Sequence, residues 1–232
     1  MQWRLLLLLS FIGIVLQISV SQAVASSVSS TEQLTYQVDS EPFGVSYEDW
    51  TAKWWQWLLS IPTADSPAVD TTGEHCGVGQ NGSVWFLAGT TGGKNVRTCT
   101  IPSGTAILIP VLNSECSTAE FPELTTEEEL YSCAKNFQDQ TQQLEFVIDG
   151  TNFEQVEIPR IVSPLFNVTF PEDNIFGAPA GMTKAVSDGN WVFLKPLSEG
   201  EHEIISKGLS LDVTTTATNT FVSDVTYQLS VQ

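Results

Sequence analysis

The chain has 232 residues, and 27 of them are Asp or Glu against 9 that are Lys or Arg, which gives a formal net charge of −18 at pH 7. Nucleic acids and anionic lipid surfaces are bound mainly through Lys and Arg, so we expect neither as a partner. The length and the 42% hydrophobic residues allow one large domain with its own core.

The N-terminus has the pattern of a secretory signal peptide over residues 1–25. One cation precedes an apolar run over residues 5–20, and the small residues Ala23 and Ala25 supply a cleavage site. An uncleaved membrane anchor is less favoured, because the run is shorter than the ~20 apolar residues that a span needs. We therefore expect residues 26–232 to act outside the cytoplasm, secreted or periplasmic, without a membrane span.

The exported part is expected to form a lead-in rich in Ser and Thr over residues 26–43 and one domain over residues 44–232. One strand is predicted in the lead-in near residues 34–38. The sequence has no internal repeat that would divide the domain into similar units.

Four cysteines in an exported chain indicate disulfide bonds. Three pairings are possible, and we favour the one in which each bridge closes a short local segment: Cys76 with Cys99, and Cys116 with Cys133. A zinc site is disfavoured, because no two cysteines form a C-x-x-C pair and the chain has only two histidines.

A first helix is predicted over residues 47–60, because Ser46 begins a capping motif and Pro62 follows the segment. It contains the stretch WTAKWWQW, in which three of the four tryptophans fall on one broad apolar face at 100° per residue. Trp55 lies on the other side of the helix. Packing therefore explains three rings and leaves the role of Trp55 open.

A second helix, predicted over residues 127–140, follows a capping box at Thr126 and Glu129. Elsewhere, short apolar runs separated by Gly and Pro turns predict strands. Pro110 interrupts one run and indicates a sheet edge or a bulge there. About ten strands and two helical insertions indicate a β-sandwich, jelly-roll-like in type. The runs are 83–89, 96–101, 105–112, 144–148, 153–158, 165–170, 185–194, 201–206, 209–214 and 225–231.

Four motifs together resemble those of an uncharacterised family of exported microbial proteins. They read WTAKWWQW, GQNGSVWFLAG, CTIPSGTAILIPVLNSEC and SDGNWVFLKPLSEGEH, and the resemblance covers roughly residues 44–208. It implies a secreted single-domain protein. It carries over no activity and no functional residue.

Hydrolysis by a nucleophile and a histidine base is not favoured. His75 stands beside Cys76, which we expect in a disulfide, and His202 alternates with two glutamates along a predicted strand. The G-x-S-x-G pattern is missing from the sequence. A glycosidase needs two carboxyl groups, and Glu115 is the acid we single out because it precedes Cys116. The enzyme question stays open, and we lean towards no.

The aromatic residues favour a binding function. Sugar-binding sandwiches stack pyranose faces on exposed rings, so Trp55, Trp85 and Trp191, together with Glu115, are candidate ligand-binding residues. We expect a secreted or cell-surface binding module for a glycan or polysaccharide. The alternatives are a carboxylate-dependent hydrolase and a structural cell-surface protein. For Trp55 the competing interpretation is burial between two layers.

We expect no metal and no cofactor at these residues. Oxygen-rich loops at residues 65–70, 172–174 and 188–190 offer ligands for calcium, but none matches a defined calcium loop, and Asp, Asn and Gly are also ordinary turn residues. Two glycosylation sequons, at Asn81 and Asn167, matter only if the host glycosylates exported proteins.

Overall fold

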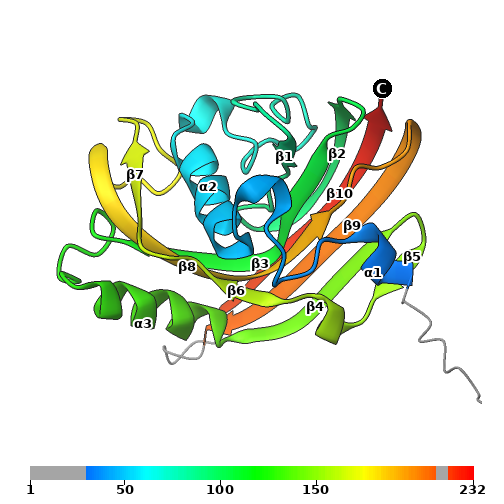
Figure 1. Ribbon diagram of the computed structural model, residues 1–232. Coiled ribbons are helices and arrows are strands. Elements are labelled where there is room, and N and C mark those ends of the chain that lie inside the picture. The colour runs from blue at the N-terminus through cyan, green and yellow to red at the C-terminus, as the bar shows by residue number, and fades with distance from the viewer. Residues whose placement is uncertain (1–29, 213–218) are drawn as a thin grey trace, which may run out of the picture.

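The computed structural model describes residues 30–212 and 219–232. The proposed signal peptide over residues 1–25 lies outside these residues. The described chain forms two five-stranded sheets packed face to face, with helices added to them (Figure 1). The β-sandwich predicted from the sequence is therefore confirmed.

Both sheets are mixed, since β1 runs parallel to β3 in one of them and β2 runs parallel to β10 in the other. The first sheet has the order β1, β3, β8, β6, with β7 also paired to β8. The second has the order β2, β10, β9, β4, β5. The strands are β1 (Val84–Phe86), β2 (Gly93–Ile101), β3 (Ala106–Ser117), β4 (Thr141–Ile148), β5 (Thr151–Phe153), β6 (Arg160–Val162), β7 (Phe166–Phe170), β8 (Gly181–Leu194), β9 (Gly200–Asp212) and β10 (Asn219–Val231).

The core between the sheets is built from alternate residues of the facing strands, as the two-residue period of a strand requires. These side chains are almost fully buried. They include Ile107, Ile109 and Val111 of β3, Val192 and Leu194 of β8, Phe146 and Ile148 of β4, Ile204 of β9, and Val225, Tyr227 and Leu229 of β10.

Helix α2 (Tyr47–Leu59) covers the opposite face of the first sheet (Figure 1). It begins as predicted, with the Oγ of Ser46 accepting a hydrogen bond from the Asp49 N–H at 3.1 Å. Trp54 packs edge-on against Trp191 of β8, with ring centroids 5.2 Å apart. Tryptophan is a modest helix former, so burial of these rings, rather than helix propensity, stabilises α2.

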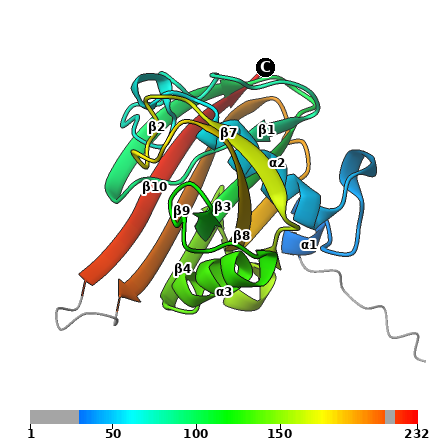
Figure 2. The same cartoon turned by 90° about the vertical axis from the view of Figure 1, so that its left-hand side faces the viewer.

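Helix α3 (Glu127–Gln138) covers the far ends of β3 and β8, on the face that elsewhere meets the second sheet (Figure 2). The capping box of Thr126 and Glu129 starts it, as predicted. The disulfide between Cys116 of β3 and Cys133 of α3 joins the two elements. Both predicted pairings are confirmed, the other being Cys76 with Cys99.

The predicted strand near residues 34–38 is wrong. The segment begins with the short helix α1 (Ser30–Leu34), and an isolated bridge joins Thr35 to Leu194 at the end of β8. The backbone of this segment forms hydrogen bonds with the end of β8, where the Tyr36 N–H donates to the Phe193 carbonyl at 2.9 Å. The lead-in therefore meets the sheet through the backbone bonds at Tyr36 and Leu34 and does not extend it.

Three other segments differ from prediction. The strand predicted at residues 153–158 ends with β5 and continues as a 3-10 turn over Gln155–Glu157. The run predicted at 201–206 and the described part of the run at 209–214 form the single strand β9, which continues through Gly208. Residues 213 and 214 lie outside the described residues. Strand β6 was not predicted, because it follows a proline and its three residues are too few to show an alternating pattern. We note one further turn, Thr63–Asp65, also of the 3-10 type.

A bulge in β3 decides which side chains face α2. The pairing of β3 with β8 shifts between Pro110 and Leu112, which confirms the irregularity predicted at Pro110. A one-residue slip moves every following side chain to the other face. After the bulge, Asn113 pairs with Gly189 and Glu115 pairs with Ser187, the residues of β8 that alternate with Trp191. The bulge thus turns Asn113 and Glu115 towards α2.

Strand β9 passes close to β3 at Gly208, where a side chain would not fit. A Cβ atom at position 208 would lie 2.6 Å from the Cβ of Leu112 and 2.8 Å from the Val111 carbonyl oxygen. We expect Gly208→Ala to lower the free energy of unfolding by about 1–3 kcal/mol, as overpacking does, measured by urea denaturation. Gly77→Ala, where no atom lies within 4 Å of the added Cβ, is the control. Equal stability of the two variants would contradict the prediction.

Candidate binding cavity

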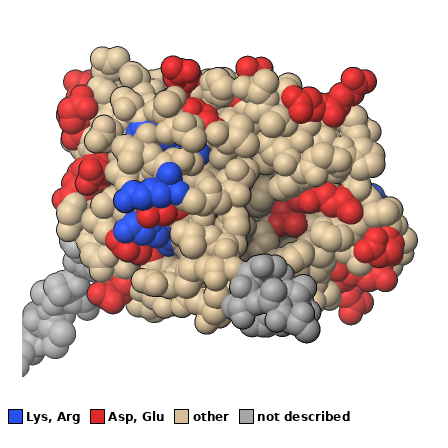
Figure 3. Space-filling model, turned by 180° about the vertical axis from the view of Figure 1, so that it is seen from behind, with Lys and Arg blue, Asp and Glu red and all other residues tan. Residues whose placement is uncertain are grey.

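A cavity of about 730 Å³ opens beside the bulged part of β3. Strand β1 pairs with β3 only along Ala106–Leu108, so the following residues of β3 form one wall. The other walls come from α2, from the C-terminal end of α3, from the loops at residues 89–91 and 175–176, and from β9 and β10. The volume lies in the range of small-ligand sites. Figure 3 shows a hollow on the back of the molecule, with acidic side chains beside it.

Two carboxyl groups line this cavity, Glu115 from β3 and Glu120 from the turn that follows it. Glu115 is 7% exposed, and neither of its carboxylate oxygens has a hydrogen-bond partner. Burial raises the pKa of Glu115 well above its ordinary value, and the neighbouring Glu120 carboxylate raises it further. Glu120 accepts a hydrogen bond from the Ser117 hydroxyl at 2.8 Å.

Trp55 also lines the cavity, and it differs from the other tryptophans of α2. The indole N–H groups of Trp50, Trp54 and Trp57 each donate to a backbone carbonyl at 2.9 Å. The Nε1 of Trp55 is buried and has no partner, although the residue is only 5% exposed. The burial interpretation therefore describes the ring, and its N–H is left without a hydrogen-bond partner.

The floor of the cavity holds a further unpaired donor, the Nδ2 of Asn113. Gly189 makes room for this side chain, because a Cβ at position 189 would lie 2.5 Å from the Cβ of Asn113 and 2.8 Å from the Nε1 of Trp191. An unpaired buried polar group costs about 1–3 kcal/mol, and native structures contain few of them. Several in one cavity indicate that a bound molecule, or water, completes their hydrogen bonds.

Phenylalanine side chains surround these polar groups. Phe137 of α3, Phe176 of the loop before β8 and Phe221 of β10 line the cavity and are 47%, 40% and 41% exposed. Phe121 lines it as well and packs against Phe137 with ring centroids 6.3 Å apart. Exposed rings that gather at one opening are typical of a binding surface.

The structure separates the four residues that the sequence singled out for binding. Trp55 and Glu115 line the same cavity. Trp191 and Trp85 do not line it. Trp191 of β8 is fully buried under Trp54 of α2, and Trp85 of β1 is half-buried against the core between the sheets. Sequence reasoning missed Asn113, Glu120 and the three exposed phenylalanines. They come from β3, the turn after it, α3, the loop before β8 and β10, and no local pattern connects these segments.

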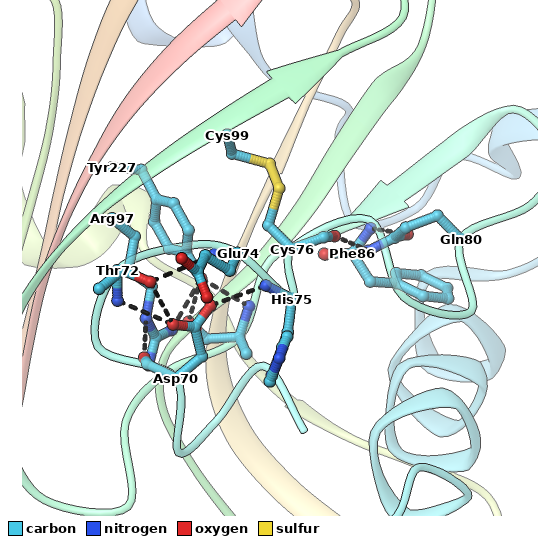
Figure 4. The surroundings of a disulfide bond; sticks show 11 residues. Asp70, Thr72, Glu74, His75, Cys76, Gln80, Phe86, Arg97, Cys99 and Tyr227 are labelled. Carbon is cyan, nitrogen blue, oxygen red and sulfur yellow. Dashed lines mark hydrogen bonds between the residues drawn. A yellow bond between two sulfur atoms is a disulfide. The ribbon is translucent and has the colours of Figure 1, made fainter. Parts of the chain in front are cut away.

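A second buried polar cluster has a structural role. The guanidinium of Arg97 in β2 is 1% exposed and donates five hydrogen bonds, to four backbone carbonyls and to the Tyr227 hydroxyl (Figure 4). The nearby Asp70 carboxylate accepts bonds from the N–H groups of Thr72 and His75. Together with the disulfide of Cys76 and Cys99, these bonds fix the loop before β1 onto the second sheet.

The remaining predicted sites lie elsewhere. The Nδ1 of His202 is 2.6 Å from Asp149, in an ion pair away from the cavity, and His75 belongs to the loop of Figure 4. In the oxygen-rich loops, Asn174 bonds to its own loop and Asp188 pairs with Arg160 at 2.6 Å. Over residues 30–212 and 219–232, His, Cys, Asp and Glu form no group of three that is arranged to hold a metal ion.

Comparisons with known proteins add little to this geometry. The chain matches no family model and no curated protein. A solved structure titled "Solution Structure of Amebosin" is similar over 66% of this chain and 100% of its own, at 12% identity and a TM-score of 0.19. Similarity at that level carries no argument about fold or function. Within the described part of the chain, none of the helices has the length and apolar character needed to cross a membrane.

Proposed function

We propose that this protein is a secreted or cell-surface binding module, that its ligand is a glycan, and that the cavity beside β3 is the binding site. The observation that carries the proposal is the set of buried, unpartnered polar atoms that line the cavity. The Nε1 of Trp55 and the Nδ2 of Asn113 need acceptors, and the Glu115 carboxyl group needs a donor. Sugar hydroxyls offer both, because each hydroxyl donates one hydrogen bond and accepts others.

The apolar part of the cavity supports the same class of ligand. A pyranose ring presents C–H groups on its faces, and these pack against aromatic rings. The exposed phenylalanines stand around the opening, where a ring entering the cavity would meet them. Two disulfides and the leader pattern of residues 1–25 fit a protein that works outside the cytoplasm. Both sequon asparagines, Asn81 and Asn167, are exposed and do not line the cavity.

The test compares two tryptophan variants on a glycan and cell-wall polysaccharide array. Trp55→Phe removes a donor from the cavity and should weaken binding about 3- to 10-fold, the effect of one neutral hydrogen bond. Trp85→Phe is the matched control, because its Nε1 is also buried and unpartnered but the residue lies outside the cavity. Equal binding by the two variants would exclude this cavity as the site, and binding to no glycan would refute the proposal.

A carboxylate-dependent hydrolase is the second candidate, favoured by the two acids in one concave site and by the raised pKa of Glu115. It predicts that incubation with an oligosaccharide that the protein binds releases new reducing ends. Both Glu115→Gln and Glu120→Gln should then abolish the release. Retention of intact oligosaccharide by the native protein over long incubation would leave the binding function alone.

A further inference from the structure

We infer that the glycan bound in this cavity carries a free, protonated amine, as a glucosamine residue does, and that Glu115 and Glu120 receive it. The inference rests on the proposed function and names the class of sugar for that same site. The observations behind it are the charges along the cavity wall, the burial of Glu115 and the character of the opening.

The side chains that line the cavity carry charge of one sign. Glu115 and Glu120 are the titratable residues among them, and the lining includes no Lys, Arg or His. Ion pairs elsewhere in the described residues join Asp139, Asp149, Asp188 and Glu145 to basic groups, and neither acid of the cavity takes part in one. The two carboxyl groups therefore face the cavity without a cation from the described chain.

An ammonium group satisfies this arrangement better than a hydroxyl does. It brings three donors and a positive charge, and its hydrogen bonds to carboxylates are roughly twice as strong as those between neutral groups. A buried carboxylate without a counter-charge is costly, and a cationic ligand removes that cost when it binds. An N-acetylated amine has lost the charge and adds bulk, and an acidic sugar would be repelled.

The opening of the cavity also favours a cation. Phe137, Phe176 and Phe221 present exposed rings there, and the face of an aromatic ring attracts an ammonium group. The net charge of −18 adds a long-range attraction for cationic ligands. That attraction is not specific to one site, so the experiment must separate it from binding inside the cavity.

Titration calorimetry with three trisaccharides, built from glucosamine, from N-acetylglucosamine and from glucose, tests the inference on the intact protein. We expect the glucosamine trisaccharide to bind about 10- to 100-fold more tightly than the other two, because charged hydrogen bonds replace neutral ones. Glu115→Gln and Glu120→Gln should each reduce this preference strongly. Glu203→Gln, which removes an exposed acid outside the cavity, is the matched control for general charge attraction and should keep the preference.

Each remaining outcome has one meaning. Similar affinity for all three trisaccharides would overturn the amine inference and leave the glycan-binding function standing. A preference for glucosamine that persists in both Glu115→Gln and Glu120→Gln would place the amine elsewhere and overturn the assignment to this pair. A loss of preference in Glu203→Gln as well would show that net charge alone attracts the amine. Failure of all three sugars to bind would refute the proposed function together with the inference.

Discussion

The Glu115→Gln variant is expected to be more stable than the native protein at pH 7.5, by about 1 kcal/mol or more, the cost of burying a charged group without a partner. Burial and the Glu120 carboxylate raise the pKa of Glu115 in the folded protein above its ordinary value of 4.5. Glutamine has nearly the same shape, carries no charge to desolvate and can donate a hydrogen bond to Glu120.

The pH dependence of this gain has a definite sign. Between the ordinary pKa of Glu115 and its raised pKa in the fold, the folded state binds more protons than the unfolded state. The native protein therefore loses stability as pH rises through that interval. The advantage of Glu115→Gln should be small at pH 4 and should grow towards neutral pH, as urea unfolding at several pH values will measure.

Two comparisons make this result specific to the cavity. Glu203→Gln, at an exposed position, should change the free energy of unfolding by less than about 0.5 kcal/mol at every pH. Native protein that is more stable than Glu115→Gln at pH 7.5 would contradict the prediction and mean that Glu115 has a favourable partner in solution. A gain in stability, in contrast, identifies an acid that destabilises the fold, as expected of a residue kept for function.

Arg97→Met is expected to lower the free energy of unfolding by about 3–5 kcal/mol, which for a protein of this size lowers the melting temperature by roughly 10 °C. The guanidinium donates to the carbonyls of Ala68, Asp70, Ala88 and Gly89 and to the Tyr227 hydroxyl. Methionine fills much of the space but removes the donors to the Ala68, Asp70 and Gly89 carbonyls. The Ala88 carbonyl keeps one donor, the Tyr227 hydroxyl.

Arg97→Lys should restore little of this stability, because one ammonium group cannot reach acceptors that the planar guanidinium contacts from three nitrogens. Lys94→Met, at an exposed position of the same strand, is the control and should have little effect. Differential scanning calorimetry of the three variants provides the measurement. A loss below about 1 kcal/mol for Arg97→Met would show that water can replace the guanidinium in this loop.

The sequence indicated part of the candidate site through two residues. The helical angle of Trp55 set it apart from the other tryptophans of α2, and it is the one of the four whose N–H has no partner. Glu115 stood out for its place before Cys116. Both line the cavity. Trp85 and Trp191, chosen because they are large rings near turns, lie outside it, since position near a turn does not tell which face of a strand is covered.

Features that depend on neighbours along the chain could be predicted from the amino-acid sequence. Capping residues placed both long helices, apolar runs between Gly and Pro turns placed most strands, and short separations gave the disulfide pairs. Each of these depends on interactions within about 25 residues, so a local pattern records it.

The order of the strands, the continuity of β9 through Gly208 and the cavity itself depend on tertiary packing. Pro110 indicated an irregularity in the sequence, but not its consequence: the shift in pairing with β8 turned Glu115 towards α2. The cavity joins β3, α2, α3 and β10, which are far apart in the chain. Their meeting depends on long-range packing, for which the sequence carries no local pattern.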